Sequence, residues 1–459
     1  MNKIGTIAWL TWKSAFRYRV FWVLAALLAV AVVGLPLVLK TDGTAKGLVQ
    51  ILLTYTLSAT AALLGFATLW LSCGALARDV EEGQMQMVAV KPIARWQIWL
   101  GKWLGLLSLD AVLLALAGAA IFVLLQWRAD RLPPDQQKIL REEIFVSRGS
   151  VREPRPDFSR MVDAQMKKAV KDPSAISGFD LAEIRRQLTA RIETNYTAVL
   201  PYHSRLFGFN LSTLKDRLHD IPLQLRVKFH TSSGNPDVQY VTLWRVGPTN
   251  SNRRVDFPES MPADSFQEFP LPPNLLDDRG LLFVEIGNPN DVEMNFPLGE
   301  GMELLYPESS FGINFIRGLL VVFCWLALLA SIGLSAASFL SFPVAAFMSL
   351  AVLLIGLSST TVSTVVEQGT ITGFNSATSS YGHSVVDYVV VPIFTVTLKI
   401  INLVQNFSPI DSLSSGRSIT WSQLGLAGAQ IVLLLGGFFC VVGIILFTRR
   451  ELAAAQGNS

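Results

Sequence analysis

The sequence predicts a polytopic α-helical membrane protein with six transmembrane helices and an extracytoplasmic α+β insert, in which helices are followed by a β-sandwich-like part. Three observations carry this prediction. Long apolar runs alternate with short polar segments. Charge is concentrated in residues 128–310, which hold 23 of the 38 Lys and Arg residues and 26 of the 35 Asp and Glu residues. The cations elsewhere gather at the ends of apolar runs, as they do at cytoplasmic flanks.

The N-terminal segment, residues 1–19, combines aromatic and aliphatic side chains with Lys and Arg. This mixture predicts an amphipathic connecting helix on the inner membrane face. A plain positive flank before the first span is the alternative. The apolar run that follows is too long for a signal peptide and lacks a small-residue cleavage site, so we predict that it is the first span.

The first membrane region, residues 20–127, contains three apolar runs at about 20–39, 49–76 and 102–126. Each is long enough to cross roughly 30 Å of hydrocarbon at about 1.5 Å per residue. Asp110 falls inside the third run. A carboxyl group at that depth is either a functional site or a neutral acid that bonds to hydroxyls of a neighbouring helix, and the second interpretation is favoured.

Between the second and third runs, residues 77–101 form a highly charged segment with apolar and aromatic anchors. Such a mixture is typical of a short helix lying on a membrane surface. An ordinary cytoplasmic loop is the alternative. The candidate functional residues of this segment and its flank are Asp79, Glu81, Glu82, Gly83, Pro92, Arg95 and Lys102.

Residues 128–311 are predicted to form the extracytoplasmic domain, which begins with helices. Helical patterns occur at Pro134–Ser147, Phe158–Lys171 and Asp180–Thr194. In the third of these, Asp180 is placed as the N-cap.

The second part of this domain is predicted to consist of strands. Apolar and polar residues alternate over Leu223–Phe229 with a period of two. The turn sequence at 232–237 then leads into Val238–Val246, which is a hairpin signature. Leu281–Ile286 and Met302–Tyr306 continue the pattern. One-sided strands of this kind favour a small antiparallel β-sandwich.

The second membrane region, residues 312–459, contains apolar runs at 313–337, 343–364 and 424–447. A weaker apolar segment within 386–411 has two possible placements, a span or a surface element. Ten flanking cations decide between them, namely Lys3, Lys13, Arg17, Arg19, Arg78, Lys91, Arg95, Lys102, Arg449 and Arg450. Six spans place all ten on the cytoplasmic side together with both termini, whereas seven would place the last two outside. We therefore predict that 386–411 is re-entrant or interfacial.

Signatures of catalysis, metal binding and nucleic acid recognition are missing from this sequence. Gly101-Lys102 lacks the rest of a phosphate-binding loop, so ATP would have to be bound by a partner subunit, and no cofactor is expected in this chain. The four histidines lack paired ligand spacing, and the three cysteines fall inside apolar runs. The insert is nearly neutral, which argues against a nucleic acid partner. We expect no enzyme activity in this chain.

Three motifs in and after the charged segment resemble the cytoplasmic loop of ABC-2 type permeases. They are Glu82-Gly83, Lys91–Arg95 and Gly101–Gly105. Gln84 departs from the family, which usually has Thr there. The resemblance implies that 77–101 is a coupling helix seated in a groove of an ATPase subunit, and we hypothesise that Glu82 and Arg95 help to hold that subunit.

The second membrane region extends the resemblance. Ser335–Phe347 and Asn406–Asp411 resemble ABC-2 permeases of the multicopper-enzyme-maturation type. The resemblance implies the permease subunit of an ABC-2 transporter, working as an exporter in the bacterial cytoplasmic (inner) membrane. Its expected partners are an ABC ATPase subunit, a second copy or a related permease, membrane lipids and an extracytoplasmic protein. A membrane-anchored binding or scaffold protein without transport activity is the alternative.

Overall fold

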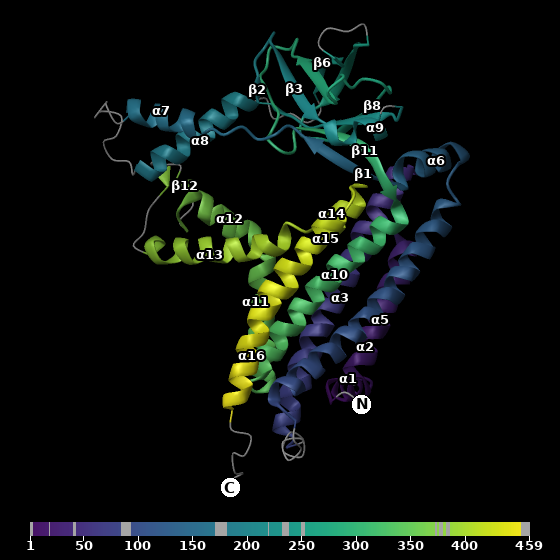
Figure 1. The fold of residues 1–459 in the computed structure, drawn as a ribbon, viewed down its shortest axis with the longest axis vertical. Helices are drawn as coiled ribbons and strands as arrows, with labels where there is room; N and C mark the ends of the chain where they lie inside the picture. The colour runs from purple at the N-terminus through teal and green to yellow at the C-terminus, as the bar shows by residue number, and fades with distance from the viewer. Residues whose placement is uncertain are drawn as a thin grey trace. The chain divides into compact units, whose positions relative to one another are not determined.

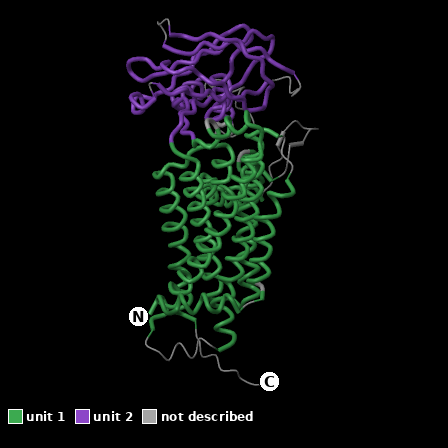
Figure 2. Tube along the Cα trace, turned by 90° about the vertical axis from the view of Figure 1, so that its right-hand side faces the viewer, with its two compact units in different colours: residues 1–147, 309–459 green, residues 148–308 purple. Residues whose placement is uncertain are grey.

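A computed structural model describes the chain at residues 3–17, 19–39, 43–83, 93–169, 181–218, 220–231, 238–248, 253–371, 374–375, 380–381 and 386–450. The chain divides into two compact units, coloured separately in Figure 2. The helical unit comprises residues 1–147 and 309–459, and the β unit comprises residues 148–308.

The helical unit consists of helices that are long and apolar for the most part, several of which run side by side (Figure 1). In chain order they are α1 (Lys3–Ala15), α2 (Arg19–Val38), α3 (Ala45–Glu81), α5 (Arg95–Ala129), α6 (Pro134–Ile139), a π-helical turn (Leu140–Ile144), α10 (Phe311–Ala337), α11 (Phe342–Leu357), α12 (Ser359–Gln368), α13 (Asp387–Gln405), α14 (Pro409–Ser414), α15 (Trp421–Ala427), a π-helical segment (Gly428–Gly436) and α16 (Gly437–Arg449). The short strands β12 (Phe374–Asn375) and β13 (Ser380–Tyr381) pair with each other.

Six described helices are long and apolar enough to cross a membrane: α2, α3, α5, α10, α13 and the continuous helix Trp421–Arg449. The predicted run 343–364 is instead a pair, α11 and α12, bent by 59°. Ser358 at the bend donates its hydroxyl proton to the Leu354 carbonyl at 2.9 Å, a local bond that often bends helices. The predicted number of six long apolar helices is thus found, but the set differs from the predicted one. It includes α13, which was predicted to be a re-entrant or interfacial element, and the predicted span 343–364 is the bent pair α11–α12.

The helices α3 and α5 extend beyond the predicted runs at 49–76 and 102–126. Arg and Glu are good helix formers, so the charged residues at 78–81 continue α3. Only residues 82–94 remain between the two helices, so the connection is shorter than the predicted 77–101. Pro92 lies outside the described residues, as do the rest of 84–92.

The β unit contains two four-stranded sheets with the orders β1-β11-β4-β8 and β3-β9-β6-β7, and a small sheet β2-β10-β5. Its elements are β1 (Val146–Arg152), α7 (Ser159–Ala169), α8 (Leu181–Thr197), β2 (Ala198–Val199), β3 (Ser204–Asn210), a 3-10 turn (Ser212–Leu214), α9 (Lys215–Leu218), β4 (Leu223–Val227), β5 (His230–Thr231), β6 (Gln239–Val246), β7 (Val255–Pro262), β8 (Gln267–Leu271), β9 (Leu281–Gly287), β10 (Met294–Asn295) and β11 (Met302–Ser310).

One apolar core joins the inner faces of the two four-stranded sheets. Leu225 and Val227 of β4 lie in it with Val284 of β9 and Trp244 of β6, and each is at most 1% exposed. The alternating pattern of β6, in which every second residue is buried, shows how a period of two places one face against this core. The predicted sandwich-like fold of the insert is confirmed by these strands.

Two local predictions for the insert were wrong. The strands β4 and β6 do not form a hairpin, because β4 pairs with β8 and β11 whereas β6 pairs with β7 and β9 in the other sheet. The helix predicted at Pro134–Ser147 ends at Ile144, and β1 begins at Val146. The residues before β1 belong to the helical unit, since Leu140 is buried in its core, so the β unit is shorter than 128–311. The predicted cap Asp180 lies outside the described residues.

Candidate functional site at the loop end of the helical unit

The helix ends on either side of residues 82–94 gather with three other helix ends of the same unit. We call this cluster the loop end of the helical unit. It includes the C-termini of α3, α10 and α16 and the N-termini of α5 and α11, as the contacts below show. Most of the charged residues predicted from the sequence lie here.

Arg95, the first residue of α5, is bonded to the last turn of α16. Its Nη1 donates to the carbonyl oxygens of Phe447 at 2.6 Å, Thr448 at 2.9 Å and Arg450 at 2.7 Å. The last carbonyls of a helix have no partner within the helix and carry partial negative charge. The Arg95 guanidinium therefore caps α16 and ties the start of α5 to it.

Arg450 repeats this arrangement one helix further on. Its Nη1 lies 3.3 Å from the carbonyl oxygens of both Ala337 and Ser338, at the end of α10. Two arginines thus form a chain of contacts from α5 through α16 to α10. Arg95 and Arg450 were both counted from the sequence as topology signals, and the structure gives each of them a helix-capping role as well.

Lys102 and Asp79 form an ion pair between α5 and α3. The Lys102 ammonium also donates to the Ala75 carbonyl at 2.5 Å, and the side chain is only 9% exposed. A buried ammonium needs such partners, because an unpaired charge away from water is costly. This pair joins the two helices that carry the loop.

Glu81 caps a different helix. Its Oε1 accepts a hydrogen bond at 2.8 Å from the backbone N–H of Phe342, the first residue of α11. A carboxylate is favourable at a helix N-terminus, where N–H groups are unpaired. The Arg78 guanidinium lies 4.1 Å from the centre of the Phe342 ring and adds a cation–π contact. The last turn of α3 is therefore attached to α11.

Glu82 and Gly83 lead from α3 into the loop itself. Glu82 is exposed and ends α3, and Gly83 has a φ of 72°, which glycine adopts without strain. Of the seven predicted residues, Asp79 and Lys102 are thus brought together, while Glu81 and Arg95 contact other helices.

The N-terminal helix α1 packs on α5 at Gly101 and Gly105. From the sequence, these two glycines were noted only as part of the motif Gly101–Gly105. A Cβ at Gly101 would lie 2.7 Å from the Ile7 Cβ, and one at Gly105 would lie 2.7 Å from the Thr11 Cβ. Small residues four apart allow such close helix packing in membranes. Trp9 on α1 remains exposed, and Figure 2 shows the N-terminal segment running across the end of the unit, as expected of a surface helix.

Asp110 lies apart from the loop end, in the interior of α5. It is 2% exposed, it hydrogen-bonds to Thr68 of α3, and its Oδ2 has no hydrogen-bond partner among the described residues. The Thr68 hydroxyl also donates to the Leu64 carbonyl at 2.7 Å. Asp110 therefore lies against a hydroxyl of the neighbouring helix α3, and its role as a structural acid stays a prediction.

Another buried charge in the helical unit, Arg317 of α10, was missed from the sequence. It is 7% exposed, and its Nη1 donates to the Ile419 carbonyl at 3.0 Å. Asn314, one turn earlier, donates to the Arg417 carbonyl and accepts from the Ile419 N–H, both at 2.7 Å. Together they hold the segment between α14 and α15 on α10. An arginine inside the apolar run 313–337 was the available signal.

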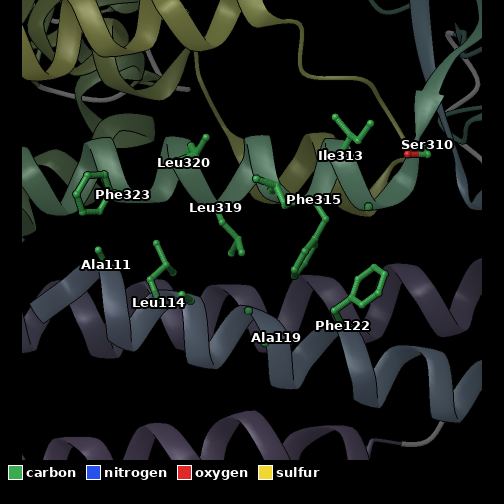
Figure 3. A pocket seen from close by; sticks show the side chains of 14 residues that line it. Ala111, Leu114, Ala119, Phe122, Ser310, Ile313, Phe315, Leu319, Leu320 and Phe323 are labelled. Carbon is green, nitrogen blue, oxygen red and sulfur yellow. The ribbon is translucent and has the colours of Figure 1, made fainter. Parts of the chain in front are cut away.

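Two other features are less suited to be the functional site. A groove of about 660 Å³ between α5 and α10 is lined almost wholly by apolar side chains such as Leu114, Phe122 and Phe323 (Figure 3). It lacks the converging polar groups that orient a ligand. In the β unit, burial raises the pKa of the Glu153 carboxyl, although the adjacent Arg205 guanidinium, 2.9 Å away, opposes this shift. This ion pair joins the residue that follows β1 to β3, so its role is structural.

Comparison with known families bears directly on the loop end. Residues 5–140 match the family model of the ABC-2 family transporter protein. This stretch is similar to the ABC-2 family transporter domain. It covers α1, α2, α3, α5 and α6, and so contains the loop and both helices that carry it. No curated protein and no solved structure matches the chain.

The similarity to an ABC-2 domain and the apolar helices among the described residues indicate a multi-pass membrane protein, and the similarity supports a transport permease role. The match also gives the kind of partner, because ABC-2 permeases normally work with an ABC ATPase. Permeases of this family are membrane components and do not carry out the catalysis themselves.

Proposed function

We propose that the chain is the permease subunit of an ABC-2 exporter, energised by a separate ATPase that binds at the loop end. The observation that carries the proposal is that the loop within the matched domain is tied through helix caps to α10, α11 and α16. A push on this loop would therefore move helices from both halves of the chain. The finer resemblance to permeases of the multicopper-enzyme-maturation type belongs to the same proposal.

The mechanism requires two helix packings whose balance depends on the nucleotide state of the ATPase. Glu82, exposed beside Gly83, is placed to meet the ATPase. Arg95 would pass the movement to α16, and Arg450 would pass it on to α10. Two such permeases, identical or related, would enclose the path, and the β unit would meet an extracytoplasmic protein.

A Glu82→Lys substitution tests the ATPase contact. We expect the full-length variant to insert into the membrane normally but to retain several-fold less of a co-expressed ABC ATPase during purification, because a favourable charge contact becomes a repulsive one. The matched control is Glu300→Lys, the same reversal at an exposed residue of the β unit. Wild-type ATPase yield with Glu82→Lys would overturn the contact. Failure of every coexpressed ABC ATPase to bind the wild-type chain would favour the scaffold alternative.

The same contacts support a proposal for the orientation of the chain in the membrane. Arg450 touches the end of α10, and Glu81 touches the start of α11, so the chain leaves and returns to the loop end between residues 342 and 450. It therefore crosses an even number of times there. We propose that α11–α12 and Trp421–Arg449 are the two crossings, with the loop end and both termini in the cytoplasm of a bacterial inner-membrane protein.

This orientation predicts the labelling pattern of single cysteines. In a background with Cys73, Cys324 and Cys440 replaced by Ala, a membrane-impermeant maleimide added to intact spheroplasts should label Ser260→Cys in the β unit. It should label Glu82→Cys only after the membrane is opened. Labelling of Glu82→Cys from outside would show that the proposed orientation is wrong.

A further inference from the structure

The helix α13 is apolar and long enough to span a membrane, yet it exposes most of its apolar surface. Val389, Ile393, Val396 and Ile400 are between 48% and 62% exposed. Their spacing of four, three and four residues puts them on one face of the helix. Ile401, which lies outside this face at about 100° round the helix from Ile400, is buried. The exposed face therefore has no described covering in the chain.

The direction of α13 differs from that of the spans. Figure 1 shows α13 lying across the direction of α10 and α16, beside α12 and near the end where α14 and α15 begin. With α11–α12 and Trp421–Arg449 as the two proposed crossings between residues 342 and 450, α13 is not a span. Its exposed apolar face then needs an explanation other than the lipid-facing side of a crossing helix.

The hairpin of α12 and α13 is fixed at both of its ends. The buried Asp387 carboxylate accepts hydrogen bonds at 3.0 Å from the Thr370 hydroxyl and from the Ile371 N–H. At the other end, the Gln405 side chain donates to the Ser359 hydroxyl at 2.8 Å. These contacts hold α13 along α12, so its apolar face has a set direction.

The polar residues of α13 suit a lipid surface. Its only acidic residue, Asp387, is buried in the cap, whereas Lys399 and Tyr388 are exposed beside the apolar face. Cations and aromatic rings with a polar tip lie at the boundary between lipid and water. Trp421, 61% exposed at the start of α15, is a further boundary residue at this end of the bundle.

We infer that α13 is a membrane-surface helix that binds the outer leaflet lipids, with its apolar face among the upper acyl chains and Lys399 near the phosphates. It fastens the α12–α13 hairpin to the outer surface of the membrane while α14 docks on α10, where Leu413 packs against Gly318. The inference goes beyond the proposed ATPase coupling, but it rests on the proposed orientation, in which α11–α12 and Trp421–Arg449 are the two crossings.

The depth of single nitroxide labels tests this inference. In the cysteine-free full-length chain, each of Val389→Cys, Ile393→Cys, Val396→Cys and Ile400→Cys is labelled and placed in phosphatidylcholine vesicles. Collisions with oxygen and with a water-soluble nickel chelate then give the depth of each label. A label at Leu433→Cys, 74% exposed in the last span, is the deep reference, and Ser260→Cys is the water reference.

We expect the four α13 labels to lie at one shallow depth, about 5–10 Å inside the headgroup boundary. If α13 crossed the membrane, the depths at 389 and 400 would differ by about 16 Å, the rise of eleven helical residues. Such a gradient would overturn the inference. So would water-like exposure at all four positions, or shielding from both reagents, which would indicate a protein partner on this face.

Discussion

A Val227→Asp variant is expected to reach the membrane with an unfolded β unit. Val227 is fully buried in the core between the two sheets, and its backbone pairs with Met302 on one side and Gln267 on the other. An aspartate here would place a carboxyl group among apolar side chains without a partner. Such changes cost about 4 kcal/mol or more, a large share of the roughly 5–15 kcal/mol that stabilises a typical domain.

Limited proteolysis of the full-length protein in membranes measures this effect. The β unit of the variant should be cut at protease concentrations that leave the wild-type unit intact, while the helices of the other unit stay protected. The matched control is Val241→Asp, the same substitution on β6 at a side chain 45% exposed. Equal protease resistance of Val227→Asp and wild type would show that the core is not where the structure places it.

Sequence periodicity was sufficient to predict which residues form the core of the β unit, but not which of its strands pair. The alternation at Leu223–Phe229 identifies which face is buried, because the period of two is a local property of the chain. Which strands pair depends on contacts distant in sequence, such as β4 with β11. A turn signal between two strands favours a hairpin locally, and here the sandwich separates β4 and β6 into opposite sheets instead.

The charges at the loop end show the same limit. The sequence predicts that Asp79, Glu81 and Arg95 belong to an exposed coupling segment, because charged side chains normally face water. Their partners are a lysine on another helix, the first N–H of α11 and the last carbonyls of α16. No local sequence pattern predicts these partners, because the helix ends come together only when the bundle has formed.

The largest effect on coupling is expected from Arg95→Glu. This change replaces the guanidinium that caps α16 with a carboxylate, which the carbonyls of Phe447, Thr448 and Arg450 repel. Hydrogen bonds from a charged group contribute about 1.5–3 kcal/mol, so their loss should release the end of α16 from α5. Arg95→Lys keeps the positive charge at the helix end but not the planar donor geometry, so we expect a partial effect.

The release of α16 from α5 is measured as the distribution of distances between two spin labels. The labels are attached at Trp96→Cys and Thr448→Cys, which are both exposed positions. This distance distribution should be narrow in wild type, wider with Arg95→Lys and broad with Arg95→Glu. The control is Arg449→Glu, a charge reversal at an exposed neighbouring residue, which should leave the distribution narrow. Co-purification of the ATPase should persist with Arg95→Glu, and transport should be lost, because Arg95 transmits the movement and Glu82 makes the contact. A narrow distance distribution in Arg95→Glu together with loss of the ATPase would contradict this prediction. It would show that Arg95 contacts the ATPase and that its cap on α16 is not needed for coupling.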